Sequence, residues 1–245
     1  FRDALEMLAT RANLELPRSG GERSGDGKPT RRQVLDVLAW AERDVAAALA
    51  LMAQALGPQR PIHWLGHSLG GQIFALVPGH ERVSSVMAVA AGSGYFGHYP
   101  PRLRRQSRWL WWVVAPAAVA LAGYFPGRRL RMLDDLPAGA IRQWRRWCLS
   151  PEYLMSEGGR ERRERYAAVR TPMLVMSFTD DEYMSAPSID ALHGWYAGAP
   201  RQPRRIAPAQ AGLEGIGHFG FFRERTGRQR LWPELLHWID RQETA

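Results

Sequence analysis

The residues with the clearest chemical potential lie in the sequence Gly-His-Ser-Leu-Gly at positions 66–70, which Gly71 follows. An apolar stretch that indicates a buried strand precedes this sequence, and an apolar stretch that indicates a helix follows it. At a tight turn between a strand and a helix, a serine hydroxyl projects from the carboxyl end of a sheet, and flanking glycines let the backbones pass closely. We therefore expect Ser68 to be a nucleophile and the backbone N–H of Leu69 to stabilise the developing oxyanion.

A serine hydroxyl needs a base to take its proton, and the base needs a carboxylate that orients it. Asp180 and Asp181 directly follow another strand candidate, and His218 lies in a late loop between Gly217 and Gly220. In folds with a serine at such a turn, the chain order is serine, acid and then histidine. This order is met here, so both aspartates are candidates to orient His218, the expected base.

Three stretches of the sequence resemble the motifs of a known family. They are GHSLGG at 66–71, SFTDDEYMS at 177–185 and GIGHFGFF at 215–222. On these motifs, residues 31–240 resemble the α/β-hydrolases, and among them the serine hydrolases related to monoacylglycerol lipases and serine aminopeptidases.

The resemblance implies roles for individual residues. Ser68 matches the nucleophile of the family, and His218 matches its base. Aligning Ser185 with the proline that follows the family's acid places the acid at Asp181, with Asp180 as the alternative. The implied reaction is hydrolysis of a carboxylic ester, or less readily of an amide, through an acyl-enzyme and without a cofactor. The implied partner is a small-molecule ester or acyl substrate.

Short apolar strand candidates alternate with helix candidates along the chain, which is the pattern of an α/β fold with a mostly parallel sheet. The strand candidates cover residues 61–66, 83–91, 171–178 and 203–208. The helix candidates cover residues 31–56, 72–77 and 231–239. We expect residues 31–95 and 169–245 to form the hydrolase core. Residues 96–168 are predicted to form a helical cap inserted between two strands, where the family has the cap that shapes its acyl pocket.

The first 30 residues do not match the beginning of the family. The family places several strands before the nucleophile and takes a second oxyanion donor from the loop after an early strand. Here residues 1–16 have the spacing of an amphipathic helix, and residues 17–30 indicate a linker rich in glycine, serine and charge. We therefore expect an N-terminally truncated or altered fold. The alternative function is a catalytically impaired hydrolase-fold remnant, or a binding protein, that lacks the full oxyanion hole.

The composition is that of a globular protein, because 45% of the 245 residues are hydrophobic. The single cysteine, Cys148, excludes an intrachain disulfide and a cysteine-based metal cluster. The histidines and acidic residues do not have the spacing of a metal site. Since the sequence shows no secretory signal at its start, we expect a cytoplasmic protein.

The positive charge of the chain is concentrated in one segment. The net charge is +9, and residues 102–170 alone hold 15 arginines against 6 acidic residues, a balance of +9. This concentration predicts one basic surface and argues against a protein that binds nucleic acid over its whole surface.

An apolar run, Trp109–Phe125, lies in the same basic segment. It has 17 residues and contains Pro116, whereas a membrane-spanning helix needs about 20 apolar residues. The run is therefore predicted to form a lid helix, with Trp109, Trp111 and Trp112 packing inside the cap. The neighbouring arginines add the prediction of weak contact between this tryptophan-rich cap and a membrane surface.

Overall fold

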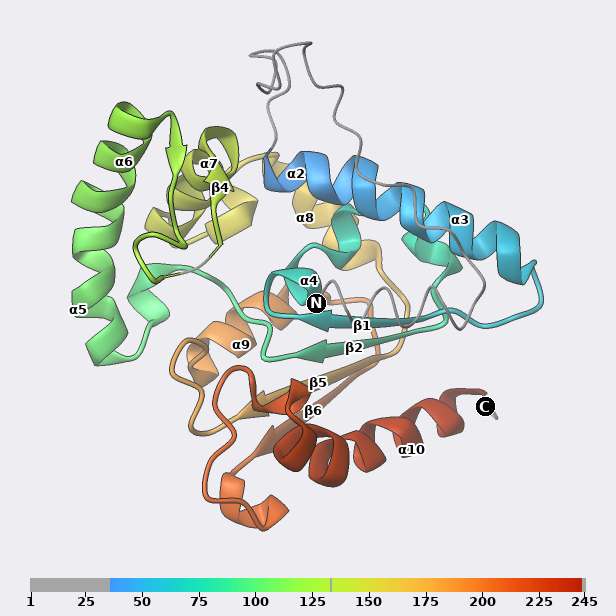
Figure 1. The fold of residues 1–245 in the computed structure, drawn as a ribbon. Coiled ribbons are helices and arrows are strands. Elements are labelled where there is room, and N and C mark those ends of the chain that lie inside the picture. Colours follow the sequence, from blue (N-terminus) through green and yellow to red (C-terminus); the bar gives the residue numbers. More distant parts are fainter. Residues whose placement is uncertain (1–35, 133, 244–245) are drawn as a thin grey trace. The chain divides into compact units, whose positions relative to one another are not determined.

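The computed structural model describes residues 36–132 and 134–243. These residues form a four-stranded sheet with the strand order β1-β2-β5-β6 (Figure 1). The strands are β1 (His63–His67), β2 (Ser85–Val89), β5 (Met173–Phe178) and β6 (Arg201–Ile206). All three pairs of neighbouring strands are parallel. The predicted α/β fold with a parallel sheet is confirmed.

The burial of the strands follows their place in the sheet. Every residue of β2 and β5 is buried, as expected for central parallel strands covered on both faces. In β6, at the edge, all residues except Ile206 are exposed. Pro203 is tolerated there because one side of an edge strand needs no hydrogen bonds to a neighbouring strand.

The sheet separates two hydrophobic cores, one on each face. Side chains of β2 and β5 point alternately into the two cores, because successive residues of a strand face opposite sides. Val86, Ala88, Met173 and Val175 face the core that also contains residues of α3 (Ala46–Leu56), α8 (Gly159–Ala168) and α9 (Ala186–Gly194). Met87, Val89, Leu174 and Met176 face the core that the last helix, α10 (Trp232–Glu243), closes with Leu235 and Trp238.

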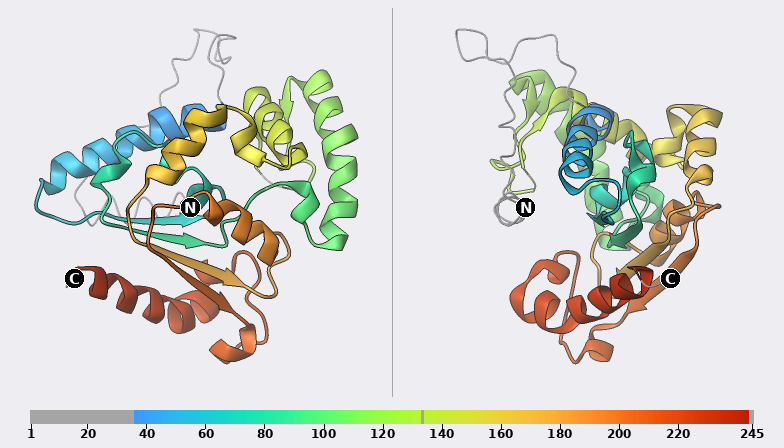
Figure 2. Two further views of the ribbon diagram at one scale, coloured as in Figure 1. Left: turned by 180° about the vertical axis from the view of Figure 1, so that it is seen from behind. Right: turned by 90° about the vertical axis from the view of Figure 1, so that its right-hand side faces the viewer.

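The helices of the hydrolase core flank the sheet on both sides (Figures 1 and 2). They are α2 (Val37–Ala39), α3 (Ala46–Leu56), α4 (Leu69–Gln72), α9 (Ala186–Gly194) and α10 (Trp232–Glu243). Short 3₁₀ and π segments extend or join them at Trp40–Val45, Phe74–Leu76, His80–Arg82, Pro208–Ala211, Gly220–Phe222 and Glu224–Leu231.

The predicted helices exist but their boundaries differ. The helix expected over 31–56 begins at Val37, where the Asp36 side chain accepts a hydrogen bond from the N–H of Ala39 at 2.8 Å. It ends at Gly57, which has a φ of 72°. The helix expected over 72–77 was misplaced, because α4 begins earlier, directly after Ser68. The predictions for residues 1–30 lie outside the described residues.

The segment between β2 and β5 is mostly helical. It contains a turn at Phe96–His98, α5 (Pro101–Trp109), a π-helical segment (Leu110–Val114), α6 (Ala115–Ala122), α7 (Ala138–Leu149), a turn at Tyr153–Ser156 and α8 (Gly159–Ala168). A two-residue antiparallel hairpin, β3 (Tyr124–Phe125) with β4 (Leu136–Pro137), was not predicted. In the part of the chain that the structure describes, no helix is long and apolar enough to cross a membrane.

Candidate active site

Ser68 lies at a strained turn between β1 and α4. Its φ of 50° and ψ of −117° are unusual for a residue other than glycine, and such backbone strain of about 1–3 kcal/mol concentrates at functional sites. The turn is held from two sides. The N–H of Ser68 donates to the carbonyl of Val89 in β2 at 3.0 Å, and its carbonyl accepts from Gly71 at 3.1 Å. The Ser68 hydroxyl has no hydrogen-bond partner among residues 36–132 and 134–243, so it is available to a substrate.

Two glycines permit this turn. A Cβ atom on Gly66 would lie 2.6 Å from the carbonyl oxygen of Gly70, and one on Gly71 would lie 2.5 Å from the Cβ of Ala91. A Cβ on Gly70 would meet no atom within 4 Å. The expectation that both glycines of the pentapeptide are sterically required is therefore right for Gly66 and wrong for Gly70, whose role falls to Gly71.

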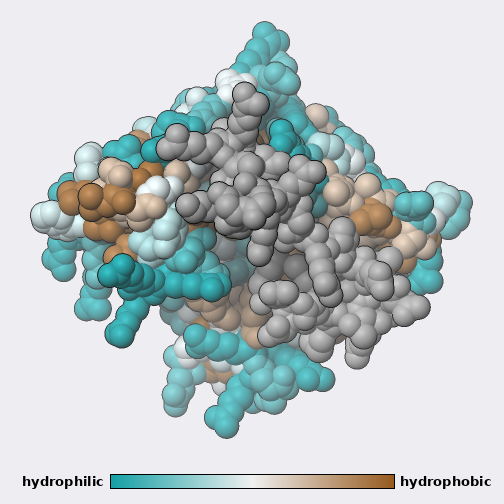
Figure 3. Space-filling model, turned by 45° about the horizontal axis from the view of Figure 1, so that its top comes forward, coloured by the Kyte–Doolittle hydropathy of each residue, from teal (hydrophilic) through white to brown (hydrophobic). Residues whose placement is uncertain are grey.

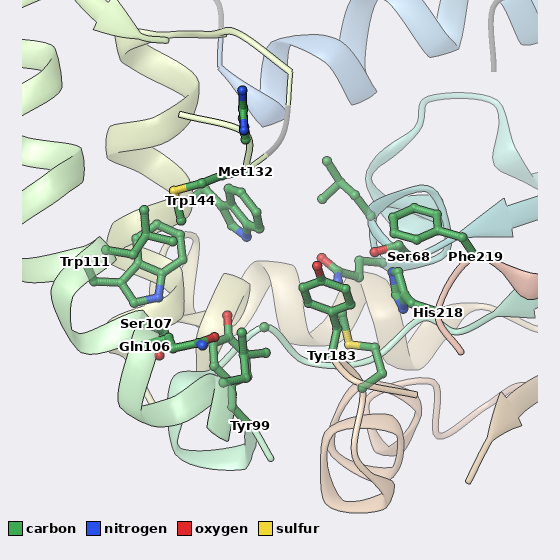
Figure 4. A pocket seen from close by; sticks show the side chains of 17 residues that line it. Ser68, Tyr99, Gln106, Ser107, Trp111, Met132, Trp144, Tyr183, His218 and Phe219 are labelled. Carbon is green, nitrogen blue, oxygen red and sulfur yellow. The ribbon is translucent and has the colours of Figure 1, made fainter. Parts of the chain in front are cut away.

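His218 and Asp181 form a buried pair. Nδ1 of His218 lies 2.9 Å and 3.1 Å from the two carboxylate oxygens of Asp181. The two residues are only 4% and 7% exposed, so water competes little for this hydrogen bond. Because Nδ1–H donates to the carboxylate, Nε2 keeps its lone pair and can accept a proton. Figure 4 shows His218 next to Ser68 at one end of a pocket that both residues line.

The two aspartates that the sequence left as candidates have different contacts. Besides His218, Asp181 binds the N–H groups of Tyr183 and Met184, both at 2.8 Å to Oδ1. Asp180 does not contact the imidazole; its Oδ2 accepts from the backbone of Ile216 at 2.7 Å and of Gly217 at 3.1 Å. Asp181 is thus the carboxylate that orients the ring, whereas Asp180 holds the loop that contains it.

Sequence reasoning missed several residues that hold His218. Oε2 of Glu182 accepts a hydrogen bond from the N–H of His218 at 3.0 Å. The His67 ring lies 4.7 Å from the His218 ring, and its Nε2–H donates to the His218 carbonyl at 2.9 Å. Burial lowers the pKa of His67 below its ordinary value, which favours the neutral ring. The rings of Tyr183 and Phe219 pack on His218 with centroids at 5.0 and 4.9 Å.

The only sequence signal for these contacts is proximity to the motifs. Glu182 and Tyr183 follow the two aspartates, His67 precedes the serine and Phe219 follows the histidine. Nothing in their spacing indicates that they meet around one imidazole, because they come from three segments, the end of β1 and two loops, that are distant in the sequence.

The pocket has a volume of about 420 Å³ and lies between the carboxyl ends of the strands and the inserted segment 96–168. Ser68, Leu69, Tyr183, Met184, His218 and Phe219 line it from the hydrolase core. Tyr99, Leu103, Gln106, Ser107, Leu110, Trp111, Arg131, Met132 and Trp144 line it from the inserted segment. Most of these side chains are apolar, so the pocket suits an apolar group placed beside Ser68 (Figure 4).

The wall of the pocket opposite Ser68 is built by aromatic packing. The rings of Trp111 and Trp144 meet edge to face at a centroid distance of 5.3 Å. Behind them, the Tyr99 hydroxyl contacts Sγ of the buried Cys148 at 3.6 Å. Burial raises the pKa values of both Tyr99 and Cys148, so the thiol stays protonated and has a structural rather than a nucleophilic role.

Comparison with known proteins agrees with this fold. The family model "Alpha/beta hydrolase family" matches residues 12–228, most of the chain. The chain therefore belongs to the alpha/beta hydrolase family and is a hydrolase. No curated protein matches it significantly.

Solved structures give similar folds at low sequence identity. The monoacylglycerol lipase of Paleococcus ferrophilus is 12% identical, with 98% of this chain and 88% of that chain covered and a TM-score of 0.51. DcsB, solved with its substrate analogue, is 13% identical over 92% and 79% of the two chains, with a TM-score of 0.49. A Rhodococcus 2-hydroxy-6-oxo-6-phenylhexa-2,4-dienoate hydrolase is 14% identical over 89% and 75%, with a TM-score of 0.46.

Proposed function

We propose that the protein is a serine hydrolase that cleaves carboxylic esters through an acyl-enzyme. The observation that carries this proposal is the convergence of three side chains from three loops. Ser68 lies at a strained turn, beside a buried histidine whose other ring nitrogen is bound by Asp181. An exposed hydroxyl, a base and an orienting carboxylate are the parts that such a reaction needs.

The proposed reaction follows from the atoms in this arrangement. Oγ of Ser68 attacks the ester carbonyl while Nε2 of His218 takes its proton, and Asp181 stabilises the resulting imidazolium. The N–H of Leu69 donates to the oxyanion of the tetrahedral intermediate. When the intermediate collapses, His218 returns the proton to the departing alcohol. Water, deprotonated by the same nitrogen, then attacks the acyl carbon. The bond to Oγ of Ser68 breaks as Nε2 returns this proton to Oγ, which releases the carboxylic acid and restores the enzyme.

The preferred substrate has an apolar acyl chain. The pocket next to Ser68 is lined mainly by aliphatic and aromatic side chains, and its volume of about 420 Å³ can hold a medium-length chain. Burying each methylene contributes about 0.8 kcal/mol. Activity should therefore rise from short to medium acyl esters. It should stop rising when the acyl chain is long enough to reach Trp111 and Trp144.

The test is hydrolysis of p-nitrophenyl esters of increasing acyl length by the full chain and two serine variants. Ser68→Ala should lose about 10⁴-fold or more of kcat, because the variant retains only binding and oxyanion stabilisation. Ser107→Ala is the matched control: Ser107 lines the same pocket but donates its hydroxyl to the carbonyl of Arg104. It should keep kcat within about threefold of the original.

Two results would contradict the proposal. One is a Ser68→Ala variant that hydrolyses the esters as well as the original protein. The other is a well-folded original protein without activity on any ester of the series, which would favour the catalytically impaired remnant or binding protein.

A further inference from the structure

The helical stretch from Pro101 to Ala122 has an inner face that is buried against the rest of the protein. Ser107, Trp111, Ala115 and Val119 recur every fourth residue, and each is at most 6% exposed. Ser107 and Trp111 also line the pocket that contains Ser68. The inner face therefore accounts for the packing of the helix and for one wall of the pocket.

The opposite side of this stretch is apolar although it faces solvent. Trp109 is 68% exposed, Trp112 50%, Val113 47% and Leu121 88%. The prediction that these tryptophans pack inside the cap was therefore wrong for Trp109, whereas Trp112 is half exposed and its ring packs on Phe96 at a centroid distance of 5.3 Å. We call the exposed residues Trp109, Trp112, Val113, Pro116, Ala117, Ala120 and Leu121 the outer face. A helix at the surface of a globular protein normally places polar residues in such positions, but here residues 109–122 contain none.

Arginines flank the outer face in the sequence, and Arg131 also lines the pocket. Residues 96–132 contain seven arginines and no acidic residue. They are Arg102, Arg104, Arg105 and Arg108 in α5, and Arg128, Arg129 and Arg131 after the strand β3. All seven are exposed. Only Arg128 has an ion pair, with Asp134 at 2.8 Å, within the part of the chain that the structure describes.

We propose that the outer face and its arginines dock on an anionic lipid surface. Exposed tryptophan, leucine and valine side chains enter the boundary between headgroups and acyl chains, while arginines bind the anionic headgroups. Figure 3 shows apolar residues gathered at the left edge of the molecule, the side on which α5 and α6 lie in Figure 1. Docked in this way, the helix lies in the plane of the surface rather than crossing the membrane.

Two other occupants of the outer face fit less well. A second copy of the chain would bring seven arginines against seven, and such like-charge repulsion opposes association. A nucleic acid would bind the arginines but would leave Val113 and Leu121 in water. An anionic lipid surface is the partner that uses the charge and the apolar side chains together.

The inference does not depend on the catalytic role of Ser68, so it is tested with the inactive Ser68→Ala chain. Sedimentation with vesicles measures binding to phosphatidylcholine alone and to an equal mixture of phosphatidylcholine and phosphatidylglycerol. We expect binding to the mixed vesicles, weaker binding to the neutral ones, and a loss of affinity as salt is raised.

Each part of the surface has a matched control variant. Leu121→Ser should weaken binding about tenfold or more because it removes an apolar side chain that the lipid would bury, whereas Leu236→Ser on α10 should not change binding. Leu236 is also exposed, at 54%. Replacing both Arg104 and Arg108 by Gln should weaken binding about 10- to 30-fold at low salt. The same replacement at the exposed Arg225 and Arg230 should weaken binding to the vesicles by less than about threefold.

Three results would overturn the inference. One is equal binding to neutral and anionic vesicles. Another is an equal loss of binding in the cap variants and in their controls. The third is a chain that does not bind vesicles but forms a dimer in size-exclusion chromatography that Leu121→Ser disperses, because the outer face would then be a contact between two copies.

Discussion

The loops around Ser68 and the inserted segment 96–168 meet at one pocket but are held in different ways. In the loops, hydrogen bonds to the backbone hold the candidate site residues: the carbonyl of Val89 binds the turn of Ser68, and the side chains of Asp180 and Glu182 bind the loop of His218. In the inserted segment, edge-to-face aromatic packing forms the wall. Hydrogen bonds fix the positions of atoms, whereas packing fixes volume and shape. Under the proposed function, the loops would determine the reaction and the inserted segment would determine which substrate reaches it.

The neighbouring aspartates test the loop side of this comparison and should show the largest effect. Asp181→Asn should lower kcat by about 10³–10⁴-fold, because an amide can favour the wrong tautomer of His218. Asp180→Asn should cost about tenfold or less in kcat, since Asp180 holds the backbone of the loop rather than the imidazole. Equal losses in kcat for the two variants would show that the loop, and not the Asp181–His218 hydrogen bond, determines activity.

Two tryptophan variants test what the comparison says of the inserted segment. Trp111→Ala should lower the free energy of unfolding by about 3–5 kcal/mol, because Trp111 is 1% exposed and its removal leaves a cavity. Trp109→Ala should change it by about 0.5 kcal/mol or less, because that side chain is 68% exposed. Urea denaturation measures both values. A similar cost for the two variants would mean that the outer face is packed in solution.

A buried histidine away from the pocket makes the stability of the hydrolase core depend on pH. Burial, with a smaller contribution from Arg201, lowers the pKa of His193 in α9 to about 4. Between that value and about 6.5 the unfolded chain binds more protons at this position, so the free energy of unfolding falls as the pH falls through this window. The loss from His193 approaches about 3 kcal/mol near pH 4.

The control for this pH dependence is His193→Phe, which keeps a ring against Tyr196. Urea denaturation at several pH values should show a smaller decrease in stability for the variant. An identical dependence on pH in both proteins would place the titrating group elsewhere.

The glycines of the turn give the smallest expected effect. Gly71→Ala should lower the free energy of unfolding by about 1–3 kcal/mol, since its Cβ would overlap that of Ala91. Gly70→Ala should be neutral or slightly stabilising, because open space surrounds that position in a helical turn. Thermal unfolding separates the two variants, and a destabilising Gly70→Ala would show that the turn is tighter than the structure indicates.

The sequence was sufficient to predict the parts of the molecule that depend on residues close to one another in the chain. Buried strands are continuous apolar runs, and the serine turn has a recognisable pattern of glycines, so the sheet and the tight turn at Ser68 could be predicted. The sequence pattern that indicates β6 is weak because an exposed edge strand contains few apolar residues.

Other features could not be predicted because they depend on which residues meet in space. Glu182, from a loop, and His67, from the end of β1, contact His218 although each is more than 30 residues away in the sequence. The run from Trp109 to Phe125 is apolar on all sides, so its sequence does not show which residues face outward. For the same reason Trp111 packs in the wall of the pocket as expected, whereas Trp109 does not.

The most direct test of the central claim is the site of a covalent adduct. After the chain is treated with a fluorophosphonate, peptide mass spectrometry identifies the modified residue. The account predicts one adduct, on Ser68, which forms much more slowly in Asp181→Asn and at the original rate in Ser107→Ala. An adduct on Ser107, or no adduct on well-folded protein, would contradict it.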